Sequence, residues 1–290
     1  MPLLTTFDMA ELGTSLQRVP WGIWALLPII LQAIFRRRGG YRYRSFISLV
    51  CLMISALYGV AASVTLPILG KAHLINWTVA RFHKMINKRF LDIGSQVEGE
   101  ENFAKDGQSA IYVCNHQTLL DIVYMGAVFP KSTSVVSKKA LKYYPILGWF
   151  MILSKSIFLD RTNREGAIKQ ARQAAEDIHR KKTSVFIFPE GTRSGVEKVD
   201  LLPFKKGAFY MATQAKVPVI PIVVANYKEI FNPKQKHFGY GDIKIRVLPA
   251  IETKDVLEDS ASIDTLANNV RDQMLTALLE ISSQEDAKTK

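Results

Sequence analysis

The sequence contains few of the residues that hold disulfides or metals. Its 290 residues include two cysteines, Cys51 and Cys114, and neither a CxxC nor an HExxH pattern occurs. Two separated cysteines cannot build a disulfide framework, and metal sites usually need clustered ligands. A GxSxG motif, which marks the serine nucleophile of many hydrolases, is also missing. These absences predict a reduced protein with no metal site and no serine acyl-enzyme.

Acidic residues are scarce relative to basic ones. The chain has 38 Lys and Arg against 26 Asp and Glu, a formal charge of +12, and 48% of its residues are hydrophobic. A positive balance suits nucleic acid, anionic lipid or an anionic substrate equally well. The high apolar share favours membrane contact, and no zinc-finger, KH or RNP signature supports a nucleic-acid module.

Two long uncharged stretches lie near the start of the chain. The first covers residues 19–35 and contains Pro28, and the second covers residues 45–70. Because about 20 apolar residues cross a bilayer, the second predicts a membrane helix, whereas the first either spans or only dips in. The loop between them has the composition of a segment that faces lipid headgroups. It contains Arg36, Arg37, Arg38, Arg42 and Arg44, with Tyr41 and Tyr43.

The middle of the chain leads from the membrane to a globular domain. Residues 74–90 predict an amphipathic helix on the membrane surface, with His73 and His83 interfacial or solvated. Residues 94–107 are polar and acidic and predict a linker. We therefore divide the chain into a membrane anchor (1–70), an interfacial helix and linker (71–107), a catalytic domain (108–283) and a disordered tail (284–290).

Within the domain, strand-like and helix-like patterns alternate. Such a rhythm predicts an α/β fold with a mainly parallel sheet covered by helices. An amphipathic helix near the end, from Ile263 to Ile281, is expected to pack on the domain. The expected strands are 109–114, 132–137, 156–160, 184–188, 218–224 and 243–248, and the expected helices are 118–129, 139–153, 164–180 and 204–215.

The stretch IYVCNHQTLLD, residues 111–121, is the first candidate for chemistry. A buried strand is expected to end at Cys114 or one residue later, before a turn with His116 and a helix from near Thr118. His116 would then lie at the carboxyl end of a strand, where open α/β sheets gather their ligands. Asp121 can reach back to the ring and fix its tautomer, which makes a general-base dyad. The alternative is that Thr118 and Asp121 only cap the helix.

A second candidate is VFIFPEGTRS, residues 185–194. A buried strand runs into Pro189, and Glu190, Gly191, Thr192 and Arg193 form a tight turn. Amides of such a turn and one guanidinium suit a phosphate or a developing oxyanion. A surface turn with an exposed arginine is an equally good interpretation of this stretch alone.

The two stretches together are more specific. NHQTLLD followed by FPEGTRS, with His116 and Glu190 74 positions apart, resembles the glycerolipid acyltransferase family, which includes the 1-acyl-glycerol-3-phosphate acyltransferases. The resemblance covers roughly residues 70–250 and includes SKK at 137–139, IFLDR at 157–161 and FKKG at 204–207. Ser156 stands where the family usually has a glycine. The paired N-terminal apolar segments look most like those of fungal members.

The resemblance implies a reaction and roles for residues. An acyl group would pass from acyl-CoA, without a cofactor, to the sn-2 hydroxyl of lysophosphatidate, giving phosphatidate in phospholipid biosynthesis. His116 would be the general base, oriented by Asp121, and Arg161 and Arg193 would hold the phosphate. The remaining substrate-binding candidates are Glu190, Gly191, Thr192, Lys138 and Lys205, of which the two lysines fit a solvated basic face equally well.

Two other functions stay open. The chain could acylate another lysophospholipid or glycerol-3-phosphate, or it could be a non-catalytic membrane scaffold that binds lipid. The expected partners are acyl-CoA, lysophosphatidate and membrane lipids, with no nucleic acid, and the oligomeric state is open. We expect an endoplasmic reticulum membrane protein whose active site lies at the membrane surface, on the cytoplasmic side shared with the arginine-rich loop.

Overall fold

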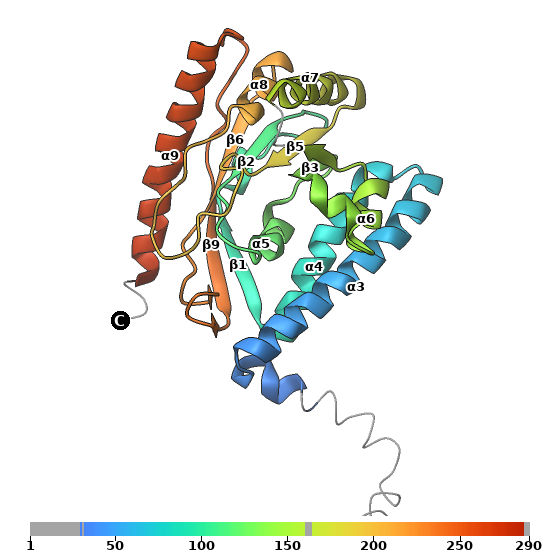
Figure 1. Cartoon of the computed structure of the whole chain (residues 1–290), viewed down its shortest axis with the longest axis vertical. Helices are drawn as coiled ribbons and strands as arrows, with labels where there is room; N and C mark the ends of the chain where they lie inside the picture. Colours follow the sequence, from blue (N-terminus) through green and yellow to red (C-terminus); the bar gives the residue numbers. More distant parts are fainter. Residues whose placement is uncertain (1–29, 31, 160–163, 287–290) are drawn as a thin grey trace, which may run out of the picture.

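The computed structural model describes residues 30, 32–159 and 164–286, which form a central sheet with helices around it (Figure 1). In spatial order the sheet consists of β1 (Ile93–Glu98), β9 (Gly241–Val247), β6 (Val219–Val224), β2 (Ile111–Cys114), β5 (Ser184–Ile187), β3 (Thr133–Lys138) and β4 (Ile157–Leu159). β2 to β6 are parallel, β9 is antiparallel to β6, and β1 is parallel to β9. The expected mainly parallel α/β fold is confirmed. A separate hairpin pairs β7 (Phe231–Asn232) with β8 (His237–Phe238).

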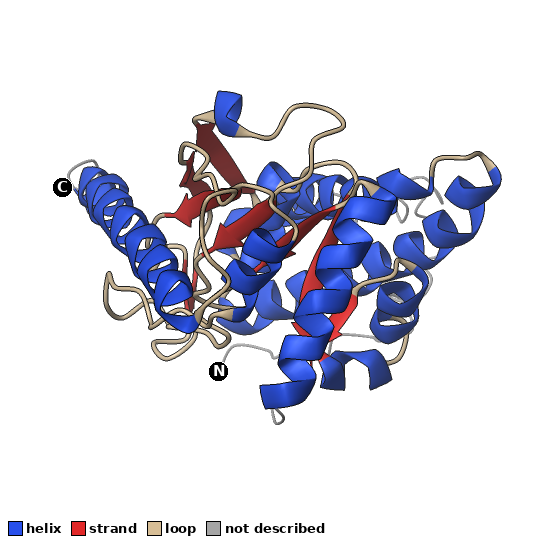
Figure 2. Ribbon diagram, turned by 90° about the horizontal axis from the view of Figure 1, so that it is seen from above, coloured by secondary structure: helices blue, strands red, loops and turns tan. Residues whose placement is uncertain are grey.

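Helices cover both faces of the sheet because its central strands are too apolar to meet water. β2, β5 and β6 are buried along their whole length, as parallel sheets require. One face packs against α7 (Arg164–Lys181), α8 (Gly207–Gln214) and α9 (Ser260–Asp286), and the other against α4 (Ile75–Leu91) and α5 (Asp121–Val128). Figure 2 shows these layers from above. Most expected elements are present, with their ends shifted by no more than five residues.

Residues 94–107 are not the polar linker that their composition predicts. The first five of them belong to β1, which pairs with β9 from Ile93 to Glu98, and η2 (Glu100–Asn102) follows. The strand was hidden because it lies at the sheet edge, where alternate side chains face water and carry polar groups. The sheet therefore begins earlier in the chain than the sequence indicates.

Residues 139–153 also differ from the single helix expected for them. They form η3 (Lys139–Tyr143) and α6 (Leu147–Leu153), separated by a tight turn in which Leu147 N donates to Pro145 O at 2.6 Å. Ile146 in this turn has a φ of +63°. The residue before a proline avoids the helical region, so the helix stops ahead of Pro145.

Ahead of the sheet, α3 (Tyr41–Ile68) and α4 form an antiparallel hairpin joined by η1 (Ala72–Leu74) (Figure 1). The rings of Tyr58 and Phe82 stack with centroids 4.6 Å apart, and Ser55 Oγ lies 2.9 Å from His83 Nδ1. His83 is 4% exposed, so the expectation that it is interfacial or solvated is wrong. The inner face of α3 allows close approach because its side chains are small. These are Cys51, Ser55, Ala56, Gly59, Ala62 and Ser63.

The outer face of α3 carries large apolar side chains that are exposed, among them Phe46, Leu49, Leu57, Val64 and Ile68. Such a face suits lipid better than water. Of the described residues, only this helix is long and apolar enough to cross a membrane. The helix expected over residues 45–70 is therefore confirmed, and its crossing stays a prediction. Most of the apolar stretch 19–35 lies outside the described residues, as do the last four residues of the expected tail.

The arginine-rich loop contacts the protein itself. Arg36 and Arg37 each bind the Asp92 carboxylate at the end of α4, with N–O distances of 2.7 and 2.6 Å. Burial raises the pKa of Asp92, but hydrogen bonds from Arg37 and Lys88 outweigh it and hold the pKa below its usual value. These arginines were expected to face headgroups, and they instead pair with a carboxylate of the protein, although the Arg37 side chain stays 62% exposed.

Arg44 fixes the start of α3 to the domain. It is fully buried, and its guanidinium donates to the carbonyl oxygens of Leu91 at 2.6 Å and of Gly239 at 2.5 Å. Arg38 and Arg42 remain exposed and can still face headgroups. Both the loop and Arg44 therefore contact the rest of the protein.

Candidate active site

His116 lies just beyond β2, at the carboxyl edge of the parallel strands. The loops after β3, β4 and β5 emerge at this same edge. Neighbouring strands are about 4.8 Å apart, so the ends of β2 and β3 are separated by roughly 10 Å. The sheet therefore gathers Lys138, the Glu190 turn and His116 into one region, as the sequence predicts.

The His116 ring is bonded to Asp121. His116 Nδ1 lies 2.7 Å from Asp121 Oδ2, which also accepts the backbone N–H groups of Gln117 at 2.7 Å and Thr118 at 3.0 Å. The Asp121 carboxylate thus caps the turn and also orients the ring, so the helix cap and the dyad predicted from the sequence are both present. With Nδ1 engaged, the neutral ring offers the lone pair of Nε2 to a substrate.

Tyr227 is a contact of Asp121 that the sequence analysis missed. Its hydroxyl donates to Asp121 Oδ1 at 2.5 Å and lies 2.9 Å from Thr118 Oγ1. Burial, followed by the charge of Asp121, raises the pKa of Tyr227 well above its ordinary value. The sequence does show that Tyr227 comes shortly after the buried β6. Polar side chains in that position reach the carboxyl edge of the sheet, so its contact with the site could have been predicted.

Asn115 and Gln117 anchor the His116 loop to the end of β6. The Asn115 amide both donates to Val224 O at 2.9 Å and accepts from Val224 N at 2.8 Å. Gln117 Nε2 donates to the carbonyl oxygens of Val224 and Ala225 at 3.1 and 3.0 Å. Both side chains are buried, so of these three residues His116 is the one that faces the site.

Glu190 joins the second candidate stretch to the first. Its Oε1 accepts the backbone N–H of His116 at 2.7 Å and its Oε2 accepts that of Leu202 at 3.0 Å. Burial raises the pKa of Glu190, while the two backbone hydrogen bonds oppose the rise. Ser194 N returns a bond to His116 O at 2.8 Å. The two stretches form one hydrogen-bonded unit.

The other candidates lie around this unit. Gly191 has a φ of +71°, and a Cβ there would come within 3.3 Å of Lys205 Cγ, so Lys205 runs close beside the turn. Thr192, Arg193 and Lys205 are exposed, and Lys138 is exposed at the end of β3. Arg161 lies outside the described residues.

Apolar side chains border the dyad. The Phe188 ring stacks on the His116 ring with centroids 4.1 Å apart and an interplanar angle of 20°. Leu119 and Ile122, on either side of the turn into α5, are 59% and 36% exposed. The His116 ring therefore has an aromatic side chain on one face, and exposed apolar side chains follow it in the sequence.

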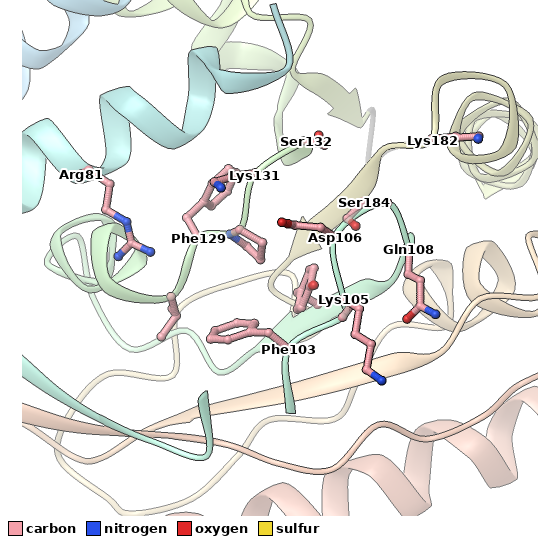
Figure 3. A pocket seen from close by; sticks show the side chains of 15 residues that line it. Arg81, Phe103, Lys105, Asp106, Gln108, Phe129, Lys131, Ser132, Lys182 and Ser184 are labelled. Atoms are coloured by element: carbon pink, nitrogen blue, oxygen red, sulfur yellow. The ribbon is translucent and has the colours of Figure 1, made fainter. Parts of the chain in front are cut away.

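A surface cavity of about 220 Å³ lies at the opposite edge of the sheet and contains none of these residues (Figure 3). Ser132 and Ser184, at the amino ends of β3 and β5, line it, together with Arg81 from α4. The Arg81 guanidinium donates to the carbonyl oxygens of Gly126 and Ala127 at 2.7 and 2.6 Å, so it is used to close the end of α5. The cavity is thus separate from the candidate active site.

Comparison with known proteins points to one family. The family model described as Acyltransferase matches residues 94–225. The 1-acyl-sn-glycerol-3-phosphate acyltransferase of Saccharomyces cerevisiae is 42% identical over 241 residues, 83% of this chain and 78% of that protein. The alpha form from Homo sapiens is 34% identical over 208 residues, 72% of each. The crystal structure of the 1-acyl-sn-glycerophosphate (LPA) acyltransferase PlsC from Thermotoga maritima shares the fold, with a TM-score of 0.64 at 24% identity, over 82% of this chain and 94% of that one.

Proposed function

The chain belongs to the acyltransferase family, and from this premise we propose that it transfers the acyl group of acyl-CoA to the sn-2 hydroxyl of lysophosphatidate. The product is phosphatidate, for phospholipid biosynthesis. The names of the yeast and human relatives support this acceptor. The observation that carries the chemistry is the bond between His116 and Asp121 at the carboxyl edge of the sheet.

In the proposed reaction His116 Nε2 takes the proton of the acceptor hydroxyl as its oxygen attacks the thioester carbonyl carbon. Asp121 keeps the other ring proton on Nδ1 and stabilises the imidazolium. The tetrahedral intermediate expels the CoA thiolate as the C–S bond breaks, and the imidazolium returns its proton to the sulfur. Phosphatidate and CoA leave, and neither a cofactor nor an acyl-enzyme takes part.

Arg193 and Arg161 hold the phosphate in this proposal. A guanidinium matches phosphate with two parallel hydrogen bonds. Arg193 is exposed three residues beyond Glu190, whose carboxylate holds the His116 loop, so a phosphate bound there stays close to the base. Lys138 and Lys205 add positive potential at the same edge. Glu190 has both oxygens on backbone amides, which favours a role in positioning the turn that Gly191 and Thr192 continue.

The proposed location is the endoplasmic reticulum membrane, with the active site at its cytoplasmic surface, where acyl-CoA is made. Both ends of α3 contact the domain, through Arg44 at its start and through a bond from Ser132 N to His73 O just beyond its end. This packing favours α3 lying in one leaflet with its outer face toward the lipid, since a full crossing would draw the charged side chains of α4 into the hydrocarbon.

The test is to offer the purified protein acyl-CoA with lysophosphatidate, glycerol-3-phosphate or lysophosphatidylcholine, and to follow both CoA release and the acylated product. We expect phosphatidate from the first acceptor, at a specificity constant at least about tenfold above the others, because the proposed site binds both a phosphate and an acyl chain. CoA release that is independent of any acceptor would indicate a thioesterase and refute the proposal.

A further inference from the structure

Residues 138–155, which are the last residue of β3 and most of its connection to β4, contain four lysines and no acidic residue. All four lysines are exposed, and they accompany large apolar side chains that are also exposed. Tryptophan, tyrosine and lysine gathered in this way are typical of protein that lies at the interface of a bilayer. We call this set the α6 patch, and it consists of Lys138, Lys139, Lys142, Lys155, Tyr143 (74% exposed), Tyr144 (58%), Trp149 (59%), Ile152 (44%) and Leu153 (44%).

The spacing of three apolar residues in α6 places their side chains on its outer side. Trp149, Ile152 and Leu153 are three and four residues apart, so they share one side of the helix. Gly148 and Met151 on the other side are buried. A helix on a protein surface in water has polar residues outside, whereas α6 is apolar on both sides. Its outer side therefore fits a partner that is itself apolar.

The helix of the α6 patch packs closely against its neighbours. A Cβ on Gly148 would lie 2.3 Å from Lys142 O, and one on Gly59 of α3 would lie 2.4 Å from Phe150 Cδ2. These close approaches fix α6 against both η3 and α3, and Figure 1 shows α6 beside α3 on the side away from α9. Two neighbouring helices thus both carry exposed apolar side chains.

We propose that the α6 patch docks on a lipid bilayer with anionic headgroups, as a membrane contact of the domain in addition to α3. Trp149, Ile152 and Leu153 enter the interface, and the surrounding lysines meet lipid phosphates, whose charge complements theirs. A second copy of this chain fits less well, because it would bring four lysines against four lysines. The patch begins at the carboxyl end of β3, so docking holds the edge that carries His116 at headgroup depth.

Binding to vesicles tests the proposal with the full-length chain. Two double variants alter the patch, Ile152→Ser with Leu153→Ser and Lys142→Glu with Lys155→Glu. The matched control is Leu257→Ser with Leu279→Ser, which removes two leucines that are 69% and 50% exposed elsewhere. Vesicles of phosphatidylcholine mixed with phosphatidylserine should bind the wild type and the control equally and each patch variant at least about fivefold more weakly. Equal binding by all four proteins overturns the proposal.

The depth of Trp149 gives an independent measurement. In a chain with Trp21, Trp24 and Trp77 replaced by Phe, vesicles with brominated acyl chains should quench the fluorescence of Trp149. A chain that keeps Trp77 as its one tryptophan should be quenched less. If the fluorescence of Trp149 is not quenched, docking on lipid is refuted. If its emission changes with protein concentration in the absence of lipid, docking is also refuted, and the patch is a contact between copies of the chain.

Activity separates this proposal from the proposed function. With lysophosphatidate dispersed in detergent, the two patch variants should match the wild type, since no altered residue belongs to the candidate active site. With the substrate in vesicles their rate should fall along with their binding. Loss of activity in detergent as well as in vesicles, with binding unchanged, would assign the patch to catalysis and overturn its role in docking.

Discussion

The Tyr227 hydroxyl donates a 2.5 Å hydrogen bond to Asp121 Oδ1, in a position where both side chains are almost wholly buried. A phenol has one proton, so Thr118 Oγ1, 2.9 Å away, must itself donate to the Tyr227 oxygen. The bonds run in one direction, from Thr118 through Tyr227 to Asp121. They hold the carboxylate in place with its Oδ2 2.7 Å from His116 Nδ1, which is the orientation that a general base needs.

We expect Tyr227→Phe to lower kcat by roughly tenfold with little change in KM, since a buried hydrogen bond to a charged group contributes about 1.5–3 kcal/mol. Steady-state kinetics with lysophosphatidate as the varied substrate would measure both constants.

Tyr112→Phe is the matched control for this variant. Tyr112 is equally buried, but it lies in the cavity at the opposite edge of the sheet. Loss of its hydroxyl should lower the free energy of unfolding without changing kcat or KM of the folded enzyme. If the two variants behaved alike, the effect of Tyr227 would be on stability alone.

His116→Ala should abolish acyl transfer while the protein still folds, because it removes the base from a partly exposed position without opening the core. A general base contributes about 10²–10⁴ in rate. Asp121→Asn should be severely impaired as well, since its amide would present N–H to one of the donors that now surround the carboxylate. Initial rates, with unfolding curves to verify the fold, measure this, and near-normal turnover by His116→Ala would refute the mechanism.

Glu190→Gln distinguishes positioning from substrate binding. The amide keeps one acceptor for the backbone N–H of His116 or Leu202 but turns a donor toward the other, at a cost of about 1–3 kcal/mol. We expect a lower melting temperature and a lower kcat, with KM for both substrates within about twofold, because both carboxylate oxygens are engaged by backbone N–H groups. A large rise in KM for lysophosphatidate at unchanged stability would show direct binding instead.

Arg193→Lys keeps the charge but loses the two-pronged geometry, so KM for lysophosphatidate should rise about tenfold while KM for acyl-CoA changes less. Arg161→Lys should do the same. Arg180→Lys on α7, where the arginine is exposed and pairs with Asp177, is the control and should change neither constant. Should the two variants raise only the KM for acyl-CoA, both arginines belong to the donor site.

His83 predicts a pH dependence of stability. Burial lowers its pKa from 6.5 to about 4, so the folded state prefers the neutral ring and protonation favours unfolding. Stability is full above pH 6.5, falls as the pH drops from 6.5 to about 4 and then levels off. The loss is on the order of 3 kcal/mol. Denaturant unfolding at pH 7.5 and 4.5 should show a smaller difference for His83→Gln, whereas the exposed His237→Gln should behave as the wild type.

Local contacts were open to prediction from the sequence, and distant ones were not. His116 and Asp121 are five residues apart, so a turn into a helix suffices to bring them together. The link between His116 and Glu190 was suggested by family resemblance, and nothing in either stretch shows that it runs through a backbone N–H. Tyr227 carries no motif, and β1 depends on β9, nearly 150 residues later.

Burial was the other property that the sequence left undetermined. Periodicity identifies the face on which His83 lies, but it does not show that the small side chains of α3 close over that face. The same pattern suits a helix resting on a membrane and a helix packed beneath another. Arg44 is the sharper example, because an arginine in a basic loop is rarely enclosed.

The burial of Arg44 limits how a water-soluble form of this enzyme can be designed. Cutting the chain at residue 70 would remove the guanidinium that bonds to Leu91 O and Gly239 O and would uncover the side of α4 that carries Val79 and Ile86. The truncated protein should aggregate, because the apolar outer face of α3 is removed but the apolar side of α4 becomes exposed. Solubility should come instead from keeping α3 whole and exchanging its outward residues, such as Phe46 and Leu49, for polar ones.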